Sequence, residues 1–346
     1  MLQFSSPSIE QYYAYVSSVL SPYLQGSLVG PLSLLISLLV FTVILSVVLS
    51  AFAYTFGWVE RKLIARIQAR RGPTYVGKYG FFQNLADLVK LLSKEDIHLA
   101  RSDTAIFKSI LPLLVSVFFL MLVLIPFNSF FVGIGSSIGL VVVFLLLSFT
   151  PLMVLLAGWS SGNKFGFISS QRSIVMLLSY EIPLIIVIAT IAMVSHSFSF
   201  FSIVGAQKSV WFAALMPVGF LIFFIVMLAE LERPPFDIRE ADSELIAGWM
   251  TDMGSPYYAI ALLLDYMRVF VGSLLISLLF LGGWNGPFLP PFAWIALKVV
   301  FVALLVVVIR ASTVRMRLDK LLKLGWGYLL PLAILNFMAY FFLFVK

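Results

Sequence analysis

Eight stretches of the chain are apolar for about the length that a helix needs to cross a bilayer, roughly 20 residues, and this feature limits the possible folds most. They are apolar on all sides, whereas strands of a membrane β-barrel alternate apolar and polar residues. Only 11% of the residues are charged, against about 25% in soluble domains. The sequence therefore predicts an all-α integral membrane protein, with spans near 28–56, 107–127, 134–157, 174–194, 211–228, 257–281, 292–309 and 328–345.

Basic residues are distributed unevenly between the loops that join these spans. Nineteen of the 23 Lys and Arg residues lie in the odd-numbered loops, and the second, fourth and sixth loops contain only Lys208. Because cytoplasmic loops collect Lys and Arg, we expect the odd-numbered loops in the cytoplasm and both termini outside. The net charge of +7 follows from this topology and does not indicate nucleic-acid binding.

The chain shows no soluble domain and no internal repeat. We expect one eight-helix membrane domain over residues 28–346, preceded by an extension, 1–27, for which an interfacial position is one interpretation. The chain has no cysteine, and its two histidines are predicted on opposite sides of the membrane. Haem and iron–sulfur clusters are held by such side chains, so we expect no redox metal in this chain.

The first cytoplasmic loop, residues 57–106, contains an amphipathic segment. One helical face is apolar and the other carries Asn84, Asp87, Lys90 and Lys94. A helix of this kind lies in the plane of the membrane interface. The predicted apolar face consists of Phe81, Phe82, Leu85, Leu88, Val89 and Leu92.

The fifth loop, residues 230–256, is strongly acidic, with seven of the chain's 16 acids between Glu230 and Asp252. The Pro234-Pro235 pair cannot continue a helix, and we predict that Asp237, Glu240 and Glu244 share one face of a helix that follows it. Neighbouring carboxylates titrate as a coupled group, which suits proton transfer. Alternatively, Asp237 and Glu240 form a helix-capping box and the other acids are simply solvated.

Charged residues also occur inside the predicted spans, where they are costly and mark ion paths or buried pairs. Glu181 is interpreted as a functional acid, with a structural pair to Arg172 or to a neighbouring helix as the alternative. Lys298 is either an anchor or part of an ion path. Asp265 and Arg268, three residues apart on one helix, are expected to neutralise each other.

Several stretches taken together, in their order and spacing, resemble the H subunit of respiratory complex I. The resemblance covers nearly the whole chain from about Gly57 onward. The matching stretches are ERKLIARIQARRGPTYVG (60–77), QNLADLVKLLSKED (83–96), AGWSSGNKFGF (157–167), SYEIPL (179–184), ERPPFDIREADSEL (232–245), GGWNGPFLPPF (282–292) and IRAS with RMRLD (309–319).

The resemblance implies a membrane subunit of a proton-translocating NADH:quinone oxidoreductase that forms the entry and chamber for quinone. It implies no cofactor in this chain and iron–sulfur clusters in cytoplasmic partner subunits. The further expected partners are small and antiporter-like membrane subunits, quinone and lipid of the cell membrane. By motif position, the implied quinone-site residues are Glu60, Arg61, Asp87, Arg233 and Asp237, and the implied proton-relay acids are Glu181, Glu230, Glu240, Asp242 and Glu244.

Two other functions remain alternatives at this stage. One is the equivalent subunit of a related membrane hydrogenase or of a complex with another electron donor. The other is a free-standing, ion-coupled secondary transporter, although transporters commonly contain internal repeats and none is visible here.

Overall fold

The computed structural model describes residues 14, 16–19, 26–97, 102–129, 131–239 and 242–344. Within these ranges the chain is helical and contains no strand. Among the described residues, seven helices are long and apolar enough to cross a membrane, so the protein is a multi-pass membrane protein. They are α2 (Gly26–Ile67), α4 (Thr104–Leu124), α5 (Gly139–Ser160), α6 (Lys164–Ser195), α11 (Ser255–Leu279), α12 (Pro291–Ser312) and a carboxyl-terminal helix made of α13 (Leu318–Leu324), a π-helical turn (Gly325–Leu329) and α14 (Leu330–Phe344).

The predicted count of eight spans is not confirmed, because the segment expected at 211–228 is divided. It forms α8 (Phe212–Leu215) and the 14-residue α9 (Pro217–Glu230). Met216 leaves the helical conformation, and Pro217 starts the second helix. Fourteen residues rise only about 21 Å, which is less than the bilayer core of about 30 Å.

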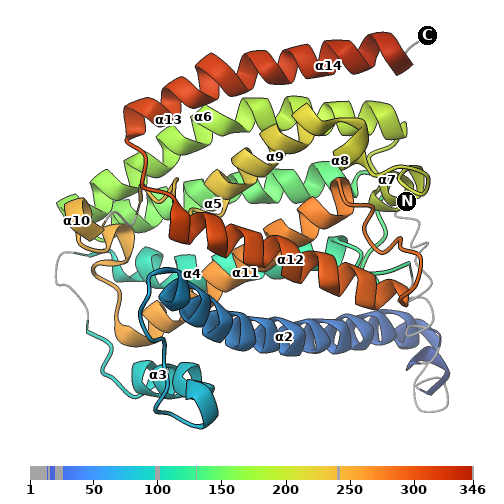
Figure 1. The fold of residues 1–346 in the computed structure, drawn as a ribbon. Helices are drawn as coiled ribbons and strands as arrows, with labels where there is room; N and C mark the ends of the chain where they lie inside the picture. The colour runs from blue at the N-terminus through green and yellow to red at the C-terminus, as the bar shows by residue number, and fades with distance from the viewer. Residues whose placement is uncertain are drawn as a thin grey trace.

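The helices run side by side as a bundle, with α2 along one edge and α14 along the opposite edge (Figure 1). We call the end that contains α3 (Gln83–Leu92) and α10 (Asp242–Leu245) the charged end. The opposite end, with α7 (Phe200–Ala206) and α8, is the far end. Helices α2 and α12 end, and helices α6 and α11 begin, at the charged end.

Helix α11 lies at the centre of the bundle, whereas α2 and α14 are peripheral. Of the most apolar window of each helix, 72% is buried in α11 but only 17% in the carboxyl-terminal helix. The outer faces of α2 and α14 expose Leu, Val, Met and Phe side chains, which is expected of helices that contact lipid. The centre of the bundle is therefore the place where buried charges must be compensated by protein groups.

The third predicted loop is shorter than expected, because α6 begins ten residues before the apolar run at 174. Helices α5 and α6 are joined by a tight turn in which the side chain of Asn163 accepts a hydrogen bond from Phe165 N at 3.1 Å. A Cβ atom at Gly158 would lie 2.3 Å from the Gly166 carbonyl oxygen, so only glycine fits there. This close contact brings the polar first turns of α6 beside the loop that follows α9.

The amphipathic segment of the first loop forms α3, and none of the residues within the helix is buried. Its apolar face, including Leu85, Leu88 and Val89, is exposed. The extension 1–27 falls mostly outside the described residues, so its interfacial position stays a prediction.

Candidate functional site

A cavity of about 420 Å³ opens at the charged end between α2, α11 and α12, and we call it the chamber. Its walls combine apolar side chains such as Ile64 and Leu262 with many charged groups. Glu60, Arg61 and Arg233, predicted as quinone-site residues, all line it. The other polar lining residues are Arg70, Arg71, Tyr258, Asp265, Tyr266 and Arg310.

Glu60, near the end of α2, is the buried acid of the chamber. Its Oε1 atom lies 2.5 Å from Nη1 of Arg310 at the end of α12 and 3.5 Å from Nη1 of Arg233. A buried carboxylate is costly unless it is paired and hydrogen-bonded. The two guanidinium groups therefore hold Glu60 in place and tie α2 to α12 and to the acidic loop.

Asp87 joins the interfacial helix α3 to the chamber. Its carboxylate accepts hydrogen bonds from Arg61 Nη1 at 2.6 Å and from Gln83 Nε2 at 3.0 Å. Partial burial raises the pKa of Asp87, but the hydrogen bonds from Arg61 and Gln83 outweigh it, so the net pKa lies below its usual value. Asp87 is therefore a permanent anion at neutral pH.

The acidic loop does not form the predicted helix that would place Asp237, Glu240 and Glu244 on one face. After α9 the chain turns at Glu232, whose φ of 55° is left-handed, and residues 233–239 are not helical. The backbone N–H of Met316 donates to the Pro235 carbonyl at 2.9 Å, which fixes this irregular segment against the chain after α12. Asp237 lies half-buried in it and does not line the chamber.

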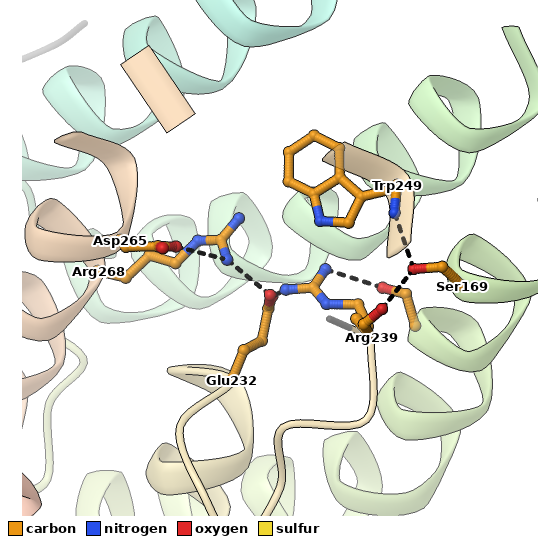
Figure 2. Close-up of polar contacts among 7 residues, drawn as sticks. Ser169, Glu232, Arg239, Trp249, Asp265 and Arg268 are labelled. Carbon is orange, nitrogen blue, oxygen red and sulfur yellow. Dashed lines mark hydrogen bonds and ion pairs between the residues drawn. The ribbon is translucent and has the colours of Figure 1, made fainter. Parts of the chain in front are cut away.

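Two buried arginines and one glutamate, from the acidic loop and from α11, lie together as Figure 2 shows. Glu232 forms an ion pair with Arg239 and lies 2.7 Å from Nη1 of Arg268 on α11. Arg268 also lies 3.8 Å from Asp265, one turn away, which itself lines the chamber. The predicted ion pair between Asp265 and Arg268 is therefore present, and Glu232 is a second, closer partner of Arg268 that the sequence did not indicate.

Residues on α6 hold Arg239 from the other side. Arg239 Nη1 donates to Ser173 Oγ at 3.0 Å, and Ser169 Oγ donates to the Arg239 carbonyl at 2.7 Å (Figure 2). Ser169 Oγ also accepts from Trp249 N at 3.1 Å. The ion-pair cluster is thus fixed by side chains from three separate parts of the chain.

Beyond this cluster lie the two acids predicted inside the membrane. Glu230, the last residue of α9, is buried, and the Tyr180 hydroxyl donates a hydrogen bond to it. Glu181 follows Tyr180 on α6, and both Glu181 and Arg239 interact electrostatically with Glu230. Ion pairs therefore run from the chamber through Asp265, Arg268 and Glu232 to Arg239. Arg239 interacts electrostatically with Glu230, as does Glu181, and we call these six residues the connected set.

Glu244 on α10 lies apart from this set, at the surface. Its carboxylate pairs with Arg172 of α6 at 2.7 Å and with Arg315 at 2.6 Å. The hydrogen bond from Arg172 lowers the pKa of Glu244 below its usual value. Arg172 therefore pairs with Glu244 and is not the structural partner of Glu181.

The roles of the remaining predicted acids stay predictions. Glu240 lies outside the described residues, and only the backbone of Asp242, at the start of α10, is described. Sequence patterns assigned no site role to Glu232, Arg239, Tyr180, Tyr266 or Arg310. An arginine within an acidic run was the only signal in the sequence for Arg239, and its partners Ser173 and Glu232 could not be assigned from that pattern.

Lys298, for which an anchor and an ion-path role were both open, is buried at the far end. Its Nζ atom donates to the carbonyls of Gly283 and Asn285, both at 2.8 Å, and faces the rings of Trp211 and Trp294 at 4.8 and 5.6 Å. These contacts favour the anchor.

Comparison with known proteins decides the family. A family model described as NADH dehydrogenase matches residues 39–341. The chain belongs to this family. It is 38% identical over 282 residues to the H subunit of NADH-quinone oxidoreductase from Dehalococcoides mccartyi, covering 81% of this chain and 79% of the relative. It is 39% identical over 287 residues to the second H subunit of NADH-quinone oxidoreductase from Geobacter sulfurreducens, covering 80% and 87%.

A third relative has another donor in its name. The H subunit of the F(420)H(2) dehydrogenase from Methanosarcina mazei is 35% identical over 299 residues, covering 81% of this chain and 85% of the relative. The NADH dehydrogenase family membership identifies the chain as a complex I-type membrane subunit of an oxidoreductase complex, which implies that other subunits accompany it.

Proposed function

We propose that the chamber receives the headgroup of a membrane quinone and that this chain couples quinone reduction to proton movement. The observation that carries the proposal is the connected set of buried charges, which starts at the chamber wall and ends at Glu230 and Glu181. Partner subunits supply the electrons from their iron–sulfur clusters, and this chain supplies binding, orientation and charge.

The chamber suits both the polar headgroup and the apolar tail of a quinone. Arginine and tyrosine side chains donate hydrogen bonds to carbonyl or phenolate oxygens, and Arg61, Arg233 and Tyr266 supply such groups. Ile64 and Leu262 provide an apolar wall for the tail. Apolar walls with a few polar groups are typical of small-molecule sites.

Reduction of a quinone to a quinol consumes two electrons and two protons. A change of charge in the chamber shifts the balance between Glu60 and its two arginines, because opposite charges stabilise each other most in a dry site. Asp265 lies on the same wall and contacts Arg268. The ion pairs transmit the change to Glu232 and Arg239, and the acids at Glu230 and Glu181 respond by exchanging protons.

The interfacial helix α3 borders the entry of quinone in this proposal. Its exposed apolar face makes a shallow groove with Val76 and Phe82, and Asp87 ties the helix to Arg61 at the chamber. A charged residue in place of Leu85 or Leu88 is expected to impair reduction of long-tailed quinone more than that of a short soluble analogue. Equal losses for both quinones would refute the entry role.

The chamber itself is tested by filling it. Ile64→Trp places a large ring in the chamber wall, whereas the control Ile67→Trp adds the same ring one turn later, at an exposed position outside the lining. We expect the first variant alone to raise the KM for quinone in the assembled complex. Unchanged KM in a normally assembled Ile64→Trp complex would contradict a quinone chamber here.

The electron donor is a separate question, since relatives are named for both NADH and F(420)H(2). We propose NADH as the donor, with another donor complex as the alternative. Purification of the complex in mild detergent, followed by identification of the copurifying subunits, distinguishes them. A subunit that binds a donor other than NADH would replace the first assignment.

We also propose that the charged end faces the cytoplasm of a cell membrane, because most Lys and Arg residues lie there. Single cysteines at Ser136 and Lys323, in a chain without natural cysteine, should be labelled from opposite sides. Labelling of both from one side would refute this orientation.

A further inference from the structure

A second cavity, of about 190 Å³, lies in the same seam between α2, α11 and α12 as the chamber, but in the half of the bundle nearer the far end. Its lining consists only of hydrocarbon side chains, among them Leu45, Phe52, Leu274 and Val299. None of the residues that line the chamber lines this cavity. We call it the apolar cavity.

Four tightly packed residues separate the two cavities. Phe56, Val269, Ala303 and Val307 form a buried cluster of their own, and each is at most 5% exposed. On α2 the cluster stands between Phe52 of the apolar cavity and Glu60 of the chamber, and on α12 between Val300 and Arg310. The apolar cavity is therefore not a continuation of the chamber.

The apolar cavity opens sideways at the outer surface of the bundle. Three of its lining residues, Val48, Phe292 and Val300, are more than a third exposed, and they lie on the two helices α2 and α12 that flank the seam. The inner wall is made by Phe270, whose ring lies 4.8 Å from that of Phe52 and 6.0 Å from that of Phe127.

The lining also decides what kind of group can occupy this space. A cavity without polar groups gives water no hydrogen-bond partners, and an apolar cavity of roughly 150 Å³ stays dry but takes up apolar molecules. In a bilayer the neighbouring medium is itself hydrocarbon, and lipid chains reach this depth without crossing any polar group. An empty space here would forfeit the dispersion contacts of its walls.

We propose that the apolar cavity is a binding site for one acyl chain of a membrane phospholipid, inserted between α2 and α12. The bound chain completes the packing of the seam where the protein leaves it open. Because the Phe56 cluster closes the cavity toward the chamber, the occupant is a lipid chain and not the tail of the quinone that reacts in the chamber.

The test uses the intact complex in vesicles of phosphatidylcholine that carries a photoreactive diazirine in the middle of its acyl chain. Buried Leu45 lines the apolar cavity, whereas Val47 of the same helix is 63% exposed and samples ordinary surrounding lipid. In the natural chain we expect the lipid probe to label both Leu45 and Val47, with Val47 as the reference for ordinary lipid contact. Absence of label at Leu45 would overturn the proposal.

Two substitutions change the space in opposite directions. Ala296→Phe fills the apolar cavity from its rim and should abolish labelling of Leu45 relative to Val47, while Val299→Ala enlarges it and should increase that ratio. Leu297→Phe, the control, adds the same ring at the neighbouring, exposed position outside the lining. The same ratio in all four proteins would refute a specific site.

A quinone analogue with a diazirine in its tail tests the alternative that the quinone tail occupies the apolar cavity. We expect it to leave Leu45 unlabelled and excess quinone to leave lipid labelling of Leu45 unchanged. Efficient labelling by the quinone probe, with competition by quinone, would overturn the assignment to lipid. Quinone reduction by Ala296→Phe should equal that of Leu297→Phe, so failure of this site and failure of the chamber are distinguishable.

Discussion

At the far end of the bundle polar side chains bond to the backbone, whereas at the charged end they bond mainly to one another. Gln207 is fully buried, donates to the carbonyls of Ile203 and Leu278, and accepts from the N–H groups of Phe212 and Gly282. By contrast, Glu60, Glu232 and Glu244 each lie between two arginines.

This difference determines which end can respond to a change of charge. Hydrogen bonds to backbone groups fix loops in one geometry, and a backbone carbonyl does not titrate. Ion pairs depend on the charge of each member, and their energy is largest where water is excluded. The charged end can therefore act as the responsive part of the molecule, and the far end as its fixed frame.

The largest effect is expected where one acid compensates two buried charges. Glu232→Gln would leave Arg239 and Arg268 without their shared anion, and breaking a buried pair in this way costs about 3–5 kcal/mol. We expect loss of most assembled complex from membranes, measured by native gel electrophoresis. Normal assembly would show that the cluster is more solvated than its burial indicates.

A smaller effect is expected at the far end, from Lys298→Met. The substitution leaves the carbonyls of Gly283 and Asn285 without their donor, and each such loss costs about 1–3 kcal/mol. The thermal midpoint of the complex should fall, while proton uptake per quinone reduced stays at the natural value. A selective loss of proton uptake would instead place Lys298 in an ion path and remove the contrast between the two ends.

The smallest effect is expected from a change of pH on the contact that holds α3 against α2. The ion pair between Asp87 and Arg61 in this contact is partly exposed, and such pairs contribute at most about 1 kcal/mol to stability. Since the folded-state pKa of Asp87 lies below the ordinary value of 3.8, the pair is formed above that value and is lost only as the pH falls through the lowered pKa. Spin labels at Arg66 and Lys90 should keep one distance between about pH 5 and about pH 8. A change of distance within this range would show that α3 is held by another, titrating contact.

How far the sequence predicted this structure depends on the range of the interactions involved. Span positions follow from local hydropathy, and seven of them were found, with Pro217 as the exception because it divides the apolar run. Helix α3 was predicted from periodicity alone. The helix expected after Pro235 does not form there, since contacts with Met316 and with the serines of α6 outweigh local helix propensity.

The site was predicted in parts but not as a connected whole. Glu60, Arg61 and Arg233 lie together at the chamber, and Glu181 interacts electrostatically with Glu230, while their functional roles stay predictions. The link between the two groups is made by Glu232, Arg239 and Arg268, whose pairing joins the acidic loop to α11 and α6. No local sequence pattern encodes this pairing, because Arg268 and the serines of α6 lie far from the acidic loop in the chain and meet it only in the folded structure.

The central claim is that Glu230 and Glu181 exchange protons when the chamber changes charge. Glu230→Gln and Glu181→Gln keep the shape of each side chain but remove the titrating group, and a glutamine at 230 can still accept the hydrogen bond from Tyr180. Glu95→Gln, at an exposed position outside the connected set, is the matched control.

The decisive measurement is quinone reduction and proton uptake on the same sample of assembled complex in sealed vesicles. We predict that the control retains both rates, whereas each of the two variants loses proton uptake, with quinone reduction falling equally if coupling is tight and less if it is loose. Natural rates of both processes in fully assembled Glu230→Gln and Glu181→Gln complexes would contradict the relay.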